Sequence, residues 1–260
     1  MSLPSPRPVR GTMMVVALAL GLATLSVGNA ALGQPGLFGA AALVAAGVLW
    51  VYGAYNATER KLTRGRRAGL AGEHVAARET LSHVAGLRAE PLTIASAYAG
   101  LARIATERGE LAEAARLADV GLRVARQSPF TTSRIPIEAE LTDHAALARA
   151  ALGEHEAAAA LLSTAAALPS GPVVRTRVLL TIKGGDAGAA LDLIDAERAL
   201  LRNGLPAIDA ELVSALEALA LTKVGDAYRS GRRGSFRVDV DDATRNYITA
   251  VHAECATVLV

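Results

Sequence analysis

The N-terminal part of the chain is strongly apolar. No charged residue occurs from Gly11 to Thr58, and the stretch is interrupted near its middle by Asn29 and by Gln34-Pro35-Gly36. A helix needs roughly 20 residues, at about 1.5 Å per residue, to cross about 30 Å of hydrocarbon. Two such helices and a tight turn fill the stretch. We therefore predict a transmembrane hairpin over residues 12–56, with helices at about 12–31 and 37–55.

A short pattern recurs four times after Arg67. A glycine is followed at once by an acidic residue and, five residues later, by an alanine, and successive glycines are 37, 44 and 32 residues apart. Glycine favours the left-handed conformation that ends a helix, the acid favours the positive end of the next helix, and alanine lets the paired helices touch. The pattern predicts helix–turn–helix units, each ended by a proline that stops the second helix. The glycine–alanine pairs are Gly72 and Ala77, Gly109 and Ala114, Gly153 and Ala158, and Gly185 and Ala190; the prolines are Pro91, Pro129, Pro169, Pro172 and Pro206.

This pattern resembles that of tetratricopeptide repeats over about residues 58–205. The clearest unit is Ser96–Gln127, where eight positions carry the residue types of the family: Tyr98, Leu101, Ala102, Ala105, Gly109, Ala114, Ala118 and Gly121. Three features depart from the family. Most bulky aromatics of its first helices are missing, the 44-residue interval implies an extended loop around Ser128–Ile137, and the first opening helix is itself polybasic.

The resemblance implies an all-α fold in which degenerate repeats stack into an α-solenoid, because one unit cannot bury its apolar face alone. Such a solenoid has a concave groove for a peptide or a partner's helix. We expect first-helix residues to line it, and the candidates are Tyr98, Arg103, Glu138 and Arg149.

The C-terminal part is predicted to cap the solenoid. Ala210–Arg229 has the pattern of a long helix, and Phe236–Val240 alternates like a strand but has no second strand to pair with, so we predict an extended linker. Asp241 or Asp242 is expected to cap a last helix that runs to about Val258.

Composition and charge support this division. Hydrophobic residues make up 52% of the chain and aromatic residues only 3%, which favours helices over sheets. The net charge is +2, but after position 67 the 20 basic and 24 acidic residues give −4. Positive charge gathers beside the apolar stretch instead, at Arg7 and Arg10 before it and at a cluster after it: Arg60, Lys61, Arg64, Arg66 and Arg67.

These flanks predict the orientation of the hairpin. Basic flanks stay on the inner side, so both ends of the hairpin should be cytoplasmic. Each basic residue near an anionic leaflet contributes on the order of 1 kcal/mol before screening, so the cluster should also hold the first helix of the domain at the surface. We expect an integral protein of a bacterial cytoplasmic membrane.

Two alternatives for the apolar stretch stay open. Residues 1–30 have the charge pattern and the small-residue Gly28-Asn29-Ala30 site of a cleaved signal peptide, in which case the second helix still spans the membrane. A soluble buried hairpin is the other, although the stretch shows no polar stripe. Gly21, Gly39 and Gly47 lie on small-residue stripes that either pack helices in lipid or reflect an alanine-rich chain.

The sequence shows no catalytic, cofactor-binding or metal-binding pattern. The five histidines lack metal-ligand spacing, Lys183-Gly184-Gly185-Asp186 is too short for a phosphate loop, and Asp239, Asp241 and Asp242 lack the glycine and glutamate of a calcium loop. Cys255 is interpreted as an apolar side chain, and the basic loop at Arg232, Arg233 and Arg237 is a solvated turn or, alternatively, an anion site. We therefore expect no enzyme, cofactor, metal or small-molecule substrate.

The predicted organisation has five parts: a cytoplasmic N-terminus at 1–11, the hairpin at 12–56, a polybasic segment at 57–67, repeats at 68–206 and capping helices at 207–260. This organisation predicts a membrane-anchored scaffold or adaptor with an unknown protein or peptide partner and contact with membrane lipid. Nucleic acid is not expected, because the net positive charge lies beside the apolar stretch and not on the folded domain. The alternative is a non-catalytic subunit of an integral membrane complex assembled through the two apolar helices.

Overall fold

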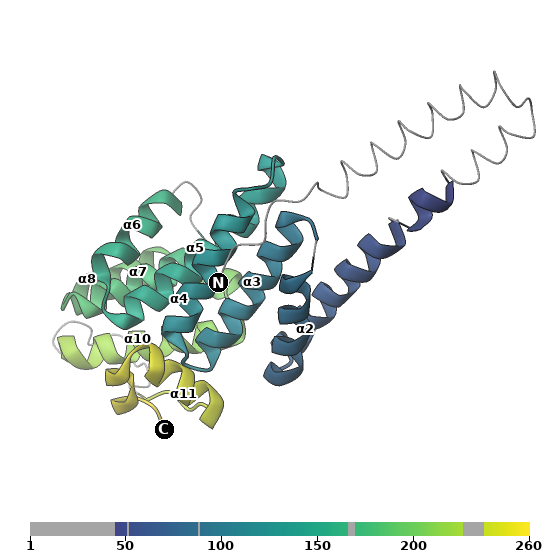
Figure 1. Ribbon diagram of the computed structural model, residues 1–260. Helices are drawn as coiled ribbons and strands as arrows, with labels where there is room; N and C mark the ends of the chain where they lie inside the picture. Colours follow the sequence, from purple (N-terminus) through teal and green to yellow (C-terminus); the bar gives the residue numbers. More distant parts are fainter. Residues whose placement is uncertain (1–44, 51, 88, 166–169, 226–236) are drawn as a thin grey trace, which may run out of the picture. The chain divides into compact units, whose positions relative to one another are not determined.

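The computed structural model describes residues 45–50, 52–87, 89–165, 170–225 and 237–260, and helices account for most of them (Figure 1). In this part of the chain the β contact is a single parallel bridge between Val238 and Leu259. The predicted all-α class is therefore confirmed. Of the two predicted membrane helices, 12–31 lies outside the described residues and 37–55 is described only from residue 45. Among the described residues, no helix has both the length and the apolar character needed to cross a membrane.

The described helices follow one another through short turns. Residues 45–50 and 52–70 are helical. They are followed by α2 (His74–Gly86), α3 (Pro91–Glu107), α4 (Leu111–Ala125), α5 (Thr131–Leu152), α6 (His155–Ala165), α7 (Gly171–Lys183), α8 (Ala187–Ala196), α9 (Arg198–Gly204), α10 (Ala207–Val224), α11 (Asp242–Val251) and the 3₁₀ helix η2 (Ala253–Thr257).

The four turns at the repeated glycines have the same geometry. Gly72, Gly109, Gly153 and Gly185 have φ values of 78°, 74°, 87° and 88°. Each glycine N–H donates to the carbonyl three residues back, and the next acidic residue donates its N–H to the carbonyl five residues back, at 2.8–3.2 Å in all eight bonds. This pair of bonds is the Schellman motif that ends a helix. The alanine five residues after each glycine is fully buried in all four units.

The prolines begin helices rather than only ending them, which corrects their predicted role. Pro91 is the first residue of α3, Pro172 lies in the first turn of α7, and Pro206 is the N-cap of α10. Proline suits a helix start, because the N–H that it lacks has no partner there. The extended loop predicted around Ser128–Ile137 is also wrong. Residues from Thr131 on belong to the 22-residue helix α5, which accommodates Pro136.

Two C-terminal predictions need correction as well. The helix predicted at Ala210–Arg229 is α10, which begins at Ala207 and ends at Val224, before Gly225 with φ 75°. Asp241 caps α11 as expected, since its carboxylate accepts from the Thr244 N–H at 2.7 Å. The last helix, however, ends at Val251 rather than Val258, and η2 follows it. The Val238 N–H donates to the Val258 carbonyl at 2.9 Å, and the Val238 carbonyl accepts from the Val260 N–H at 3.0 Å. The extended segment therefore does pair with other residues of the chain.

The chain divides into two compact units: Met1–Gly100 with Arg123–Arg134, and Leu101–Leu122 with Ile135–Val260. In the first unit, Leu81 of α2 is fully buried. A Cβ added at Gly65 would lie 2.9 Å from a methyl group of Leu81, and a Cβ added at Gly100 would lie 2.8 Å from its other methyl group. Leucine at 81 therefore fits against two glycines, one on the helix at 52–70 and one on α3.

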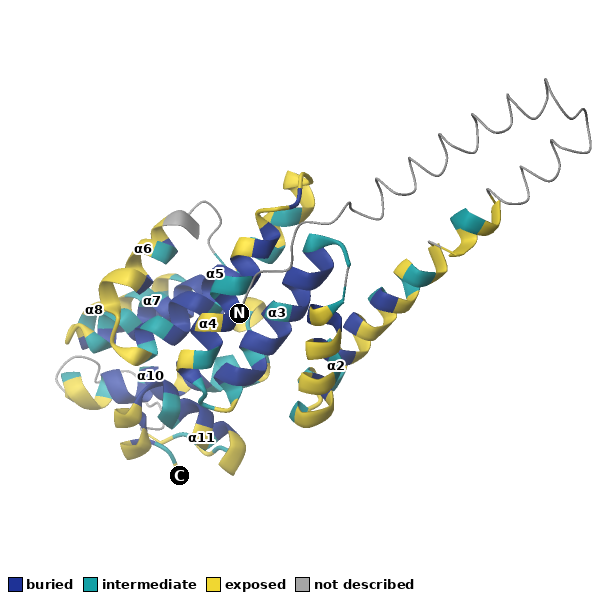
Figure 2. Cartoon of the chain, in the orientation of Figure 1, coloured by how far each residue is buried: buried dark blue, intermediate teal, exposed yellow. Residues whose placement is uncertain are grey.

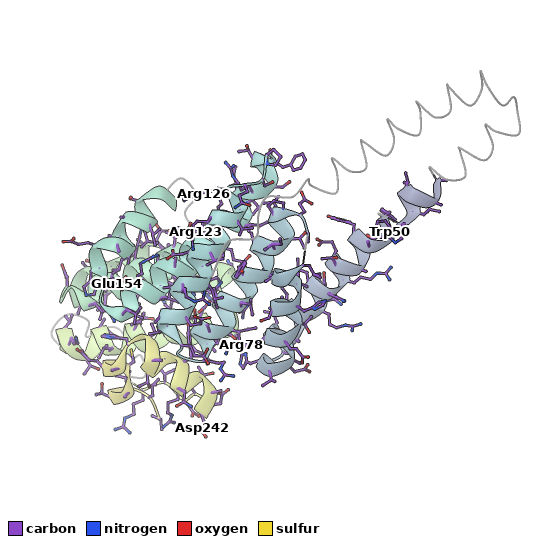
Figure 3. The ribbon with its side chains drawn as sticks, viewed as in Figure 1. Trp50, Arg78, Arg123, Arg126, Glu154 and Asp242 are labelled. Carbon is purple, nitrogen blue, oxygen red and sulfur yellow. The ribbon has the colours of Figure 1, made fainter. Side chains whose placement is uncertain are left out.

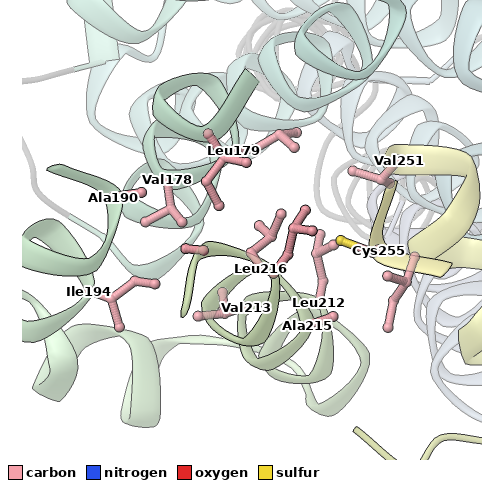
Figure 4. Close-up of a cluster of buried hydrophobic side chains, with 14 of the residues drawn as sticks. Val178, Leu179, Ala190, Ile194, Leu212, Val213, Ala215, Leu216, Val251 and Cys255 are labelled. Carbon is pink, nitrogen blue, oxygen red and sulfur yellow. The ribbon is translucent and has the colours of Figure 1, made fainter. Parts of the chain in front are cut away.

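The second unit has a continuous apolar core that joins the later repeats to the C-terminal elements. α7, α8, α10, α11 and η2 contribute to it, and Figure 4 shows Leu179, Leu216 and Cys255 among its members. α7 is buried along most of its length, whereas α6 is mostly exposed (Figure 2). α10, α11 and η2 are thus part of this core.

The turn geometry predicts the effect of a single methyl group. Gly153→Ala should lower the free energy of unfolding by about 1–2 kcal/mol, because an L-residue resists a positive φ even though the space around Gly153 is open. Gly86→Ala is the matched control, since Gly86 is the exposed last residue of α2, without a positive φ and with equally open space. Urea unfolding of both variants measures the difference, and equal stabilities would contradict a strained turn.

Candidate functional site

The four residues proposed to line a groove have the following places. Arg103 Nε pairs with Glu107 on its own helix at 2.6 Å. Arg149 Nη2 pairs with Asp119 of α4 at 2.7 Å and its Nε with Glu154 at 3.5 Å. Tyr98 of α3 and Glu138 of α5 are half-buried. The two arginines are therefore held by acidic neighbours, and the groove itself stays a prediction.

The most distinctive polar feature of the second unit is a buried charge network centred on Arg175. Its Nη2 atom donates to Asp143 Oδ2 at 2.7 Å, and its Nη1 atom pairs with Asp209 Oδ2 at 2.6 Å. The Tyr247 hydroxyl donates to Asp209 Oδ1 at 2.7 Å, and the Thr176 hydroxyl donates to Asp143 Oδ1 at 3.2 Å. Arg175 is 1% exposed and Tyr247 is also 1% exposed.

Arg175 and Asp143 lie on the buried faces of their helices. Arg175 of α7 precedes the buried Leu179 by four residues, and Asp143 of α5 precedes the buried Leu147 by four. Residues four apart share a helix face, so these charges face the core rather than solvent. Sequence reasoning missed them, although a charge at a core position of an otherwise apolar helix was a visible signal.

The network holds its charges in place. Burial lowers the pKa of the Arg175 guanidinium, but the carboxylates of Asp143 and Asp209 outweigh this, and the pKa ends above its ordinary value. Burial raises the pKa of Asp209, but the charge of Arg175 and the hydrogen bond from the Tyr247 hydroxyl lower it by more. The pKa of this carboxyl therefore ends below its ordinary value, and the carboxyl stays ionised. Burial, followed by the charge of Asp209, raises the pKa of Tyr247 well above its usual range. The shifts therefore favour a charged Arg175, a charged Asp209 and a neutral Tyr247.

The network ties four helices together and offers little chemistry. A cavity of about 10 Å³ lies beside it, lined by Arg103, His144 and Arg175 among others, which is room for no more than one water molecule. The hydrogen-bonding capacity of the two carboxylates is used by Arg175, Thr176 and Tyr247. The network therefore joins α5, α7, α10 and α11 through buried ion pairs and hydrogen bonds.

The cysteine, the basic loop and the possible metal ligands singled out in the sequence can also be located in the structure. Cys255 is fully buried, and burial followed by the charge of Glu254 raises its pKa to about 12, as suits an apolar side chain. Arg237 is exposed, while Arg232 and Arg233 lie outside the described residues. Within the described ranges, no group of three or more His, Cys, Asp or Glu side chains is placed to hold a metal ion.

The described helical residues 45–50 and 52–70, which include the end of the predicted anchor, expose both apolar and basic side chains. Leu49 and Trp50 are 68% and 75% exposed, and Trp50 stands out from the helix in Figure 3. Of the predicted basic cluster, Arg60, Lys61, Arg64 and Arg67 are exposed and Arg66 is half-buried. Gly47 has open space around it, whereas Gly21 and Gly39 lie outside the described residues.

Comparison with known proteins does not assign the chain to a family. No family model matches it, and the searches of curated proteins and of solved structures also find no match.

His144, beside the network, predicts a pH dependence of stability. Its Nδ1 atom is inaccessible to solvent, and burial lowers its pKa from the ordinary 6.5 against the opposing charges of Asp143 and Glu140. Between the pKa of His144 in the folded state and its higher value in the unfolded chain, the unfolded chain binds more protons. The contribution of neutral His144 to folding stability is therefore complete above about pH 6.5 and is lost as the pH falls toward the folded-state pKa. His144→Asn should reduce the loss of stability between about pH 7.5 and about pH 5.5 in urea unfolding.

His155→Asn is the control for that measurement, because His155 is exposed at the start of α6. His252 contributes in the same direction, since burial and then the charge of Lys183 lower its pKa, so the slope should shrink in His144→Asn without vanishing. An unchanged slope in His144→Asn would contradict this interpretation.

Proposed function

We propose that the chain is a membrane-anchored scaffold of tetratricopeptide-like repeats that binds a protein or peptide partner at the cytoplasmic face. The observation that carries the proposal is the fourfold recurrence of one turn. Four helix pairs share a left-handed glycine, the same two backbone hydrogen bonds and a buried alanine five residues on. Regular helix pairs of this kind stack into solenoids whose extended surfaces bind other proteins.

The anchor is supported by the sequence and by the helix that leads away from it. Residues 11–58 carry no charge. At the described end of this stretch, Leu49, Trp50 and Tyr52 remain exposed, although large apolar side chains gain by leaving water. Exposed basic side chains follow within one helix. This order suits a helix that leaves a bilayer on its positive side.

The C-terminal segment limits where a partner could bind on the second unit. Tyr247 of α11 bonds to Asp209 of α10, and Gly109 of the α3–α4 turn approaches Ala250 so closely that an added Cβ would lie 2.9 Å from its side chain. Arg103 and Asp209 line the small cavity beneath Tyr247. The chain's own helix therefore occupies this polar face, and the partner is proposed to bind elsewhere on the first helices, with Tyr98 of the first unit and Glu138 of the second unit as separate candidates.

The second candidate function is that of a subunit in an integral membrane complex. It is favoured by the small-residue stripes at Gly21, Gly39 and Gly47, because small residues at such spacing let helices approach closely in lipid. In that case the contacts that bind the partner are in the bilayer, and the helical domain is secondary.

Crosslinking of the full chain in intact cells separates the two functions. Tyr98→Ala combined with Glu138→Lys alters the domain, and Gly39→Leu combined with Gly47→Leu alters the predicted membrane stripe. The adaptor predicts one specific crosslinked protein that the domain variant loses and the glycine variant keeps. The opposite result would support the membrane subunit, and the absence of any specific crosslinked protein would contradict both.

A further inference from the structure

The helix at 52–70 has one side packed against the first unit and one side open. Thr58 and Leu62 on the packed side are 6% and 7% exposed, and Gly65 lies against Leu81 of α2. An open hollow of about 840 Å³ follows the other side, from Tyr52 to Glu73. A hollow of this size along a helix next to the predicted anchor is available for a ligand.

The hollow is predominantly basic. Arg60, Arg64 and Arg67 line it, and their spacing of four and three residues places them on one side of the helix. Asn56 and Thr63 lie beside them as neutral hydrogen-bonding groups. Of the two acids at the hollow, Glu59 accepts a hydrogen bond from the Thr93 hydroxyl at 2.7 Å and Glu73 lies beyond the last arginine. Three arginines thus line the hollow.

The arginines lie next to an exposed apolar surface. Leu49, Trp50 and Tyr52, which precede the arginines in the helical residues 45–50 and 52–70, are 68%, 75% and 60% exposed. Arg60 follows Tyr52 by eight residues, or about 12 Å along the helix axis. Aromatic rings favour the headgroup level of a bilayer. A helix that tilts toward the membrane surface beyond Tyr52 brings the arginines to the lipid phosphates, with Arg60 the nearest of the three. A nucleic-acid surface would not account for the apolar neighbours.

We propose that the hollow bounded by Arg60, Arg64 and Arg67 binds the phosphate groups of anionic phospholipids in the cytoplasmic leaflet. This inference rests on the membrane anchor proposed above and adds a selective headgroup contact to it. Arginine suits this ligand, because its planar guanidinium forms paired hydrogen bonds with phosphate oxygens. Asn56 and Thr63 can donate to the remaining oxygens of the headgroup. The contact would orient the helix and hence the domain on the membrane.

The single tryptophan of the chain provides the measurement. Trp50 precedes the hollow on the same helix, so energy transfer from Trp50 to a dansyl-labelled lipid reports which lipids lie beside it. The full chain is placed in phosphatidylcholine vesicles with a trace of dansyl-phosphatidylglycerol or, separately, dansyl-phosphatidylcholine. We expect transfer to indicate an enrichment of the anionic lipid by about threefold or more, since each cation near an anionic surface contributes on the order of 1 kcal/mol before screening.

The variant with Arg60→Gln, Arg64→Gln and Arg67→Gln should lower this enrichment to about one, because neutral side chains lose the charge attraction to the headgroup. Lys61→Gln is the matched control. Lys61 is exposed on the same helix but lies 3.2 Å from His83 Nε2 of α2, outside the hollow. It should keep most of the enrichment. All four positions are exposed, so thermal unfolding should stay unchanged.

The outcomes distinguish this inference from the proposed function. Equal transfer to the two labelled lipids would overturn headgroup binding and leave the anchor in place. Absence of transfer to either lipid would overturn the anchor itself. Enrichment that survives in the triple arginine variant would also overturn the assignment to this hollow. Binding of a labelled duplex DNA that the triple variant loses, without any lipid enrichment, would show that the hollow is a nucleic-acid site instead.

Discussion

Replacing Arg175 with methionine should lower the free energy of unfolding by about 3–5 kcal/mol, because it leaves two buried carboxylates without their cation. Asp143 and Asp209 are each within 2.7 Å of the guanidinium, and their side chains are 9% and 15% exposed. Methionine fills a similar volume but neutralises neither carboxylate. Urea unfolding of the two proteins at neutral pH measures the loss.

Two further variants test the cause of this loss. Arg177→Met changes a half-buried arginine two residues along α7 and should alter stability by no more than about 0.5 kcal/mol. Arg175→Met combined with Asp143→Leu and Asp209→Leu removes the stranded charges and should recover most of the stability, although Tyr247 and Thr176 lose their acceptors. A triple variant as unstable as Arg175→Met would contradict the charge explanation.

Leu81→Ala should lower the free energy of unfolding by about 2–5 kcal/mol, the usual range for a fully buried leucine. Leu81 is 0% exposed and lies against Gly65 and Gly100 in the first unit. Neither glycine has a side chain that could move into the space, so the cavity should stay open. The expected result is an early loss of structure in the helix at 52–70, seen as faster amide hydrogen exchange at Gly65 than in the parent protein.

Leu70→Ala is the matched control for this change, because Leu70 is 63% exposed on the helix that Leu81 supports. It should change stability by no more than about 0.5 kcal/mol. A loss in Leu70→Ala equal to that in Leu81→Ala would mean that α2 does not hold this helix in the way that the packing indicates.

The turns could be predicted from the sequence because their determinants are local. A glycine followed at once by an acid and, five residues later, by an alanine occurs at four places in the sequence. In the structure the four glycines have φ of 74–88° and the four alanines are buried. The ends of helices were harder to predict. The 44-residue interval between two glycines implied a loop around Ser128–Ile137, yet α5 begins at Thr131 and continues through Pro136, and only packing along the rest of this 22-residue helix explains why.

The charge network could not be assembled from the sequence. Asp143, Arg175, Asp209 and Tyr247 are on four different helices and are separated by 32 to 38 residues along the chain wherever they contact. Each one alone looks like a surface charge or a core aromatic. Only the packing of α5, α7, α10 and α11 brings them within hydrogen-bonding distance, so the sequence offered a signal for single residues but not for the site.

The predicted groove stays a prediction. The family resemblance that suggested Arg103 and Arg149 carried no information about their neighbours. In the structure Arg149 pairs with Asp119, and Arg103 lines a small cavity together with Tyr247. Crosslinking of the Tyr98 and Glu138 variants tests the other two residues of the set.

The membrane anchor and the cytoplasmic placement of the domain are tested most directly by fusing a green fluorescent protein after Val260 of the full chain. Cells that produce the fusion are fractionated, and the fluorescence of each fraction is measured. This reporter becomes fluorescent when it folds on the cytoplasmic side. Our account predicts fluorescence that stays with the membranes after an alkaline carbonate wash. Fluorescence in the supernatant would contradict the anchor, and a membrane-bound but dark fusion would contradict the cytoplasmic placement of the domain.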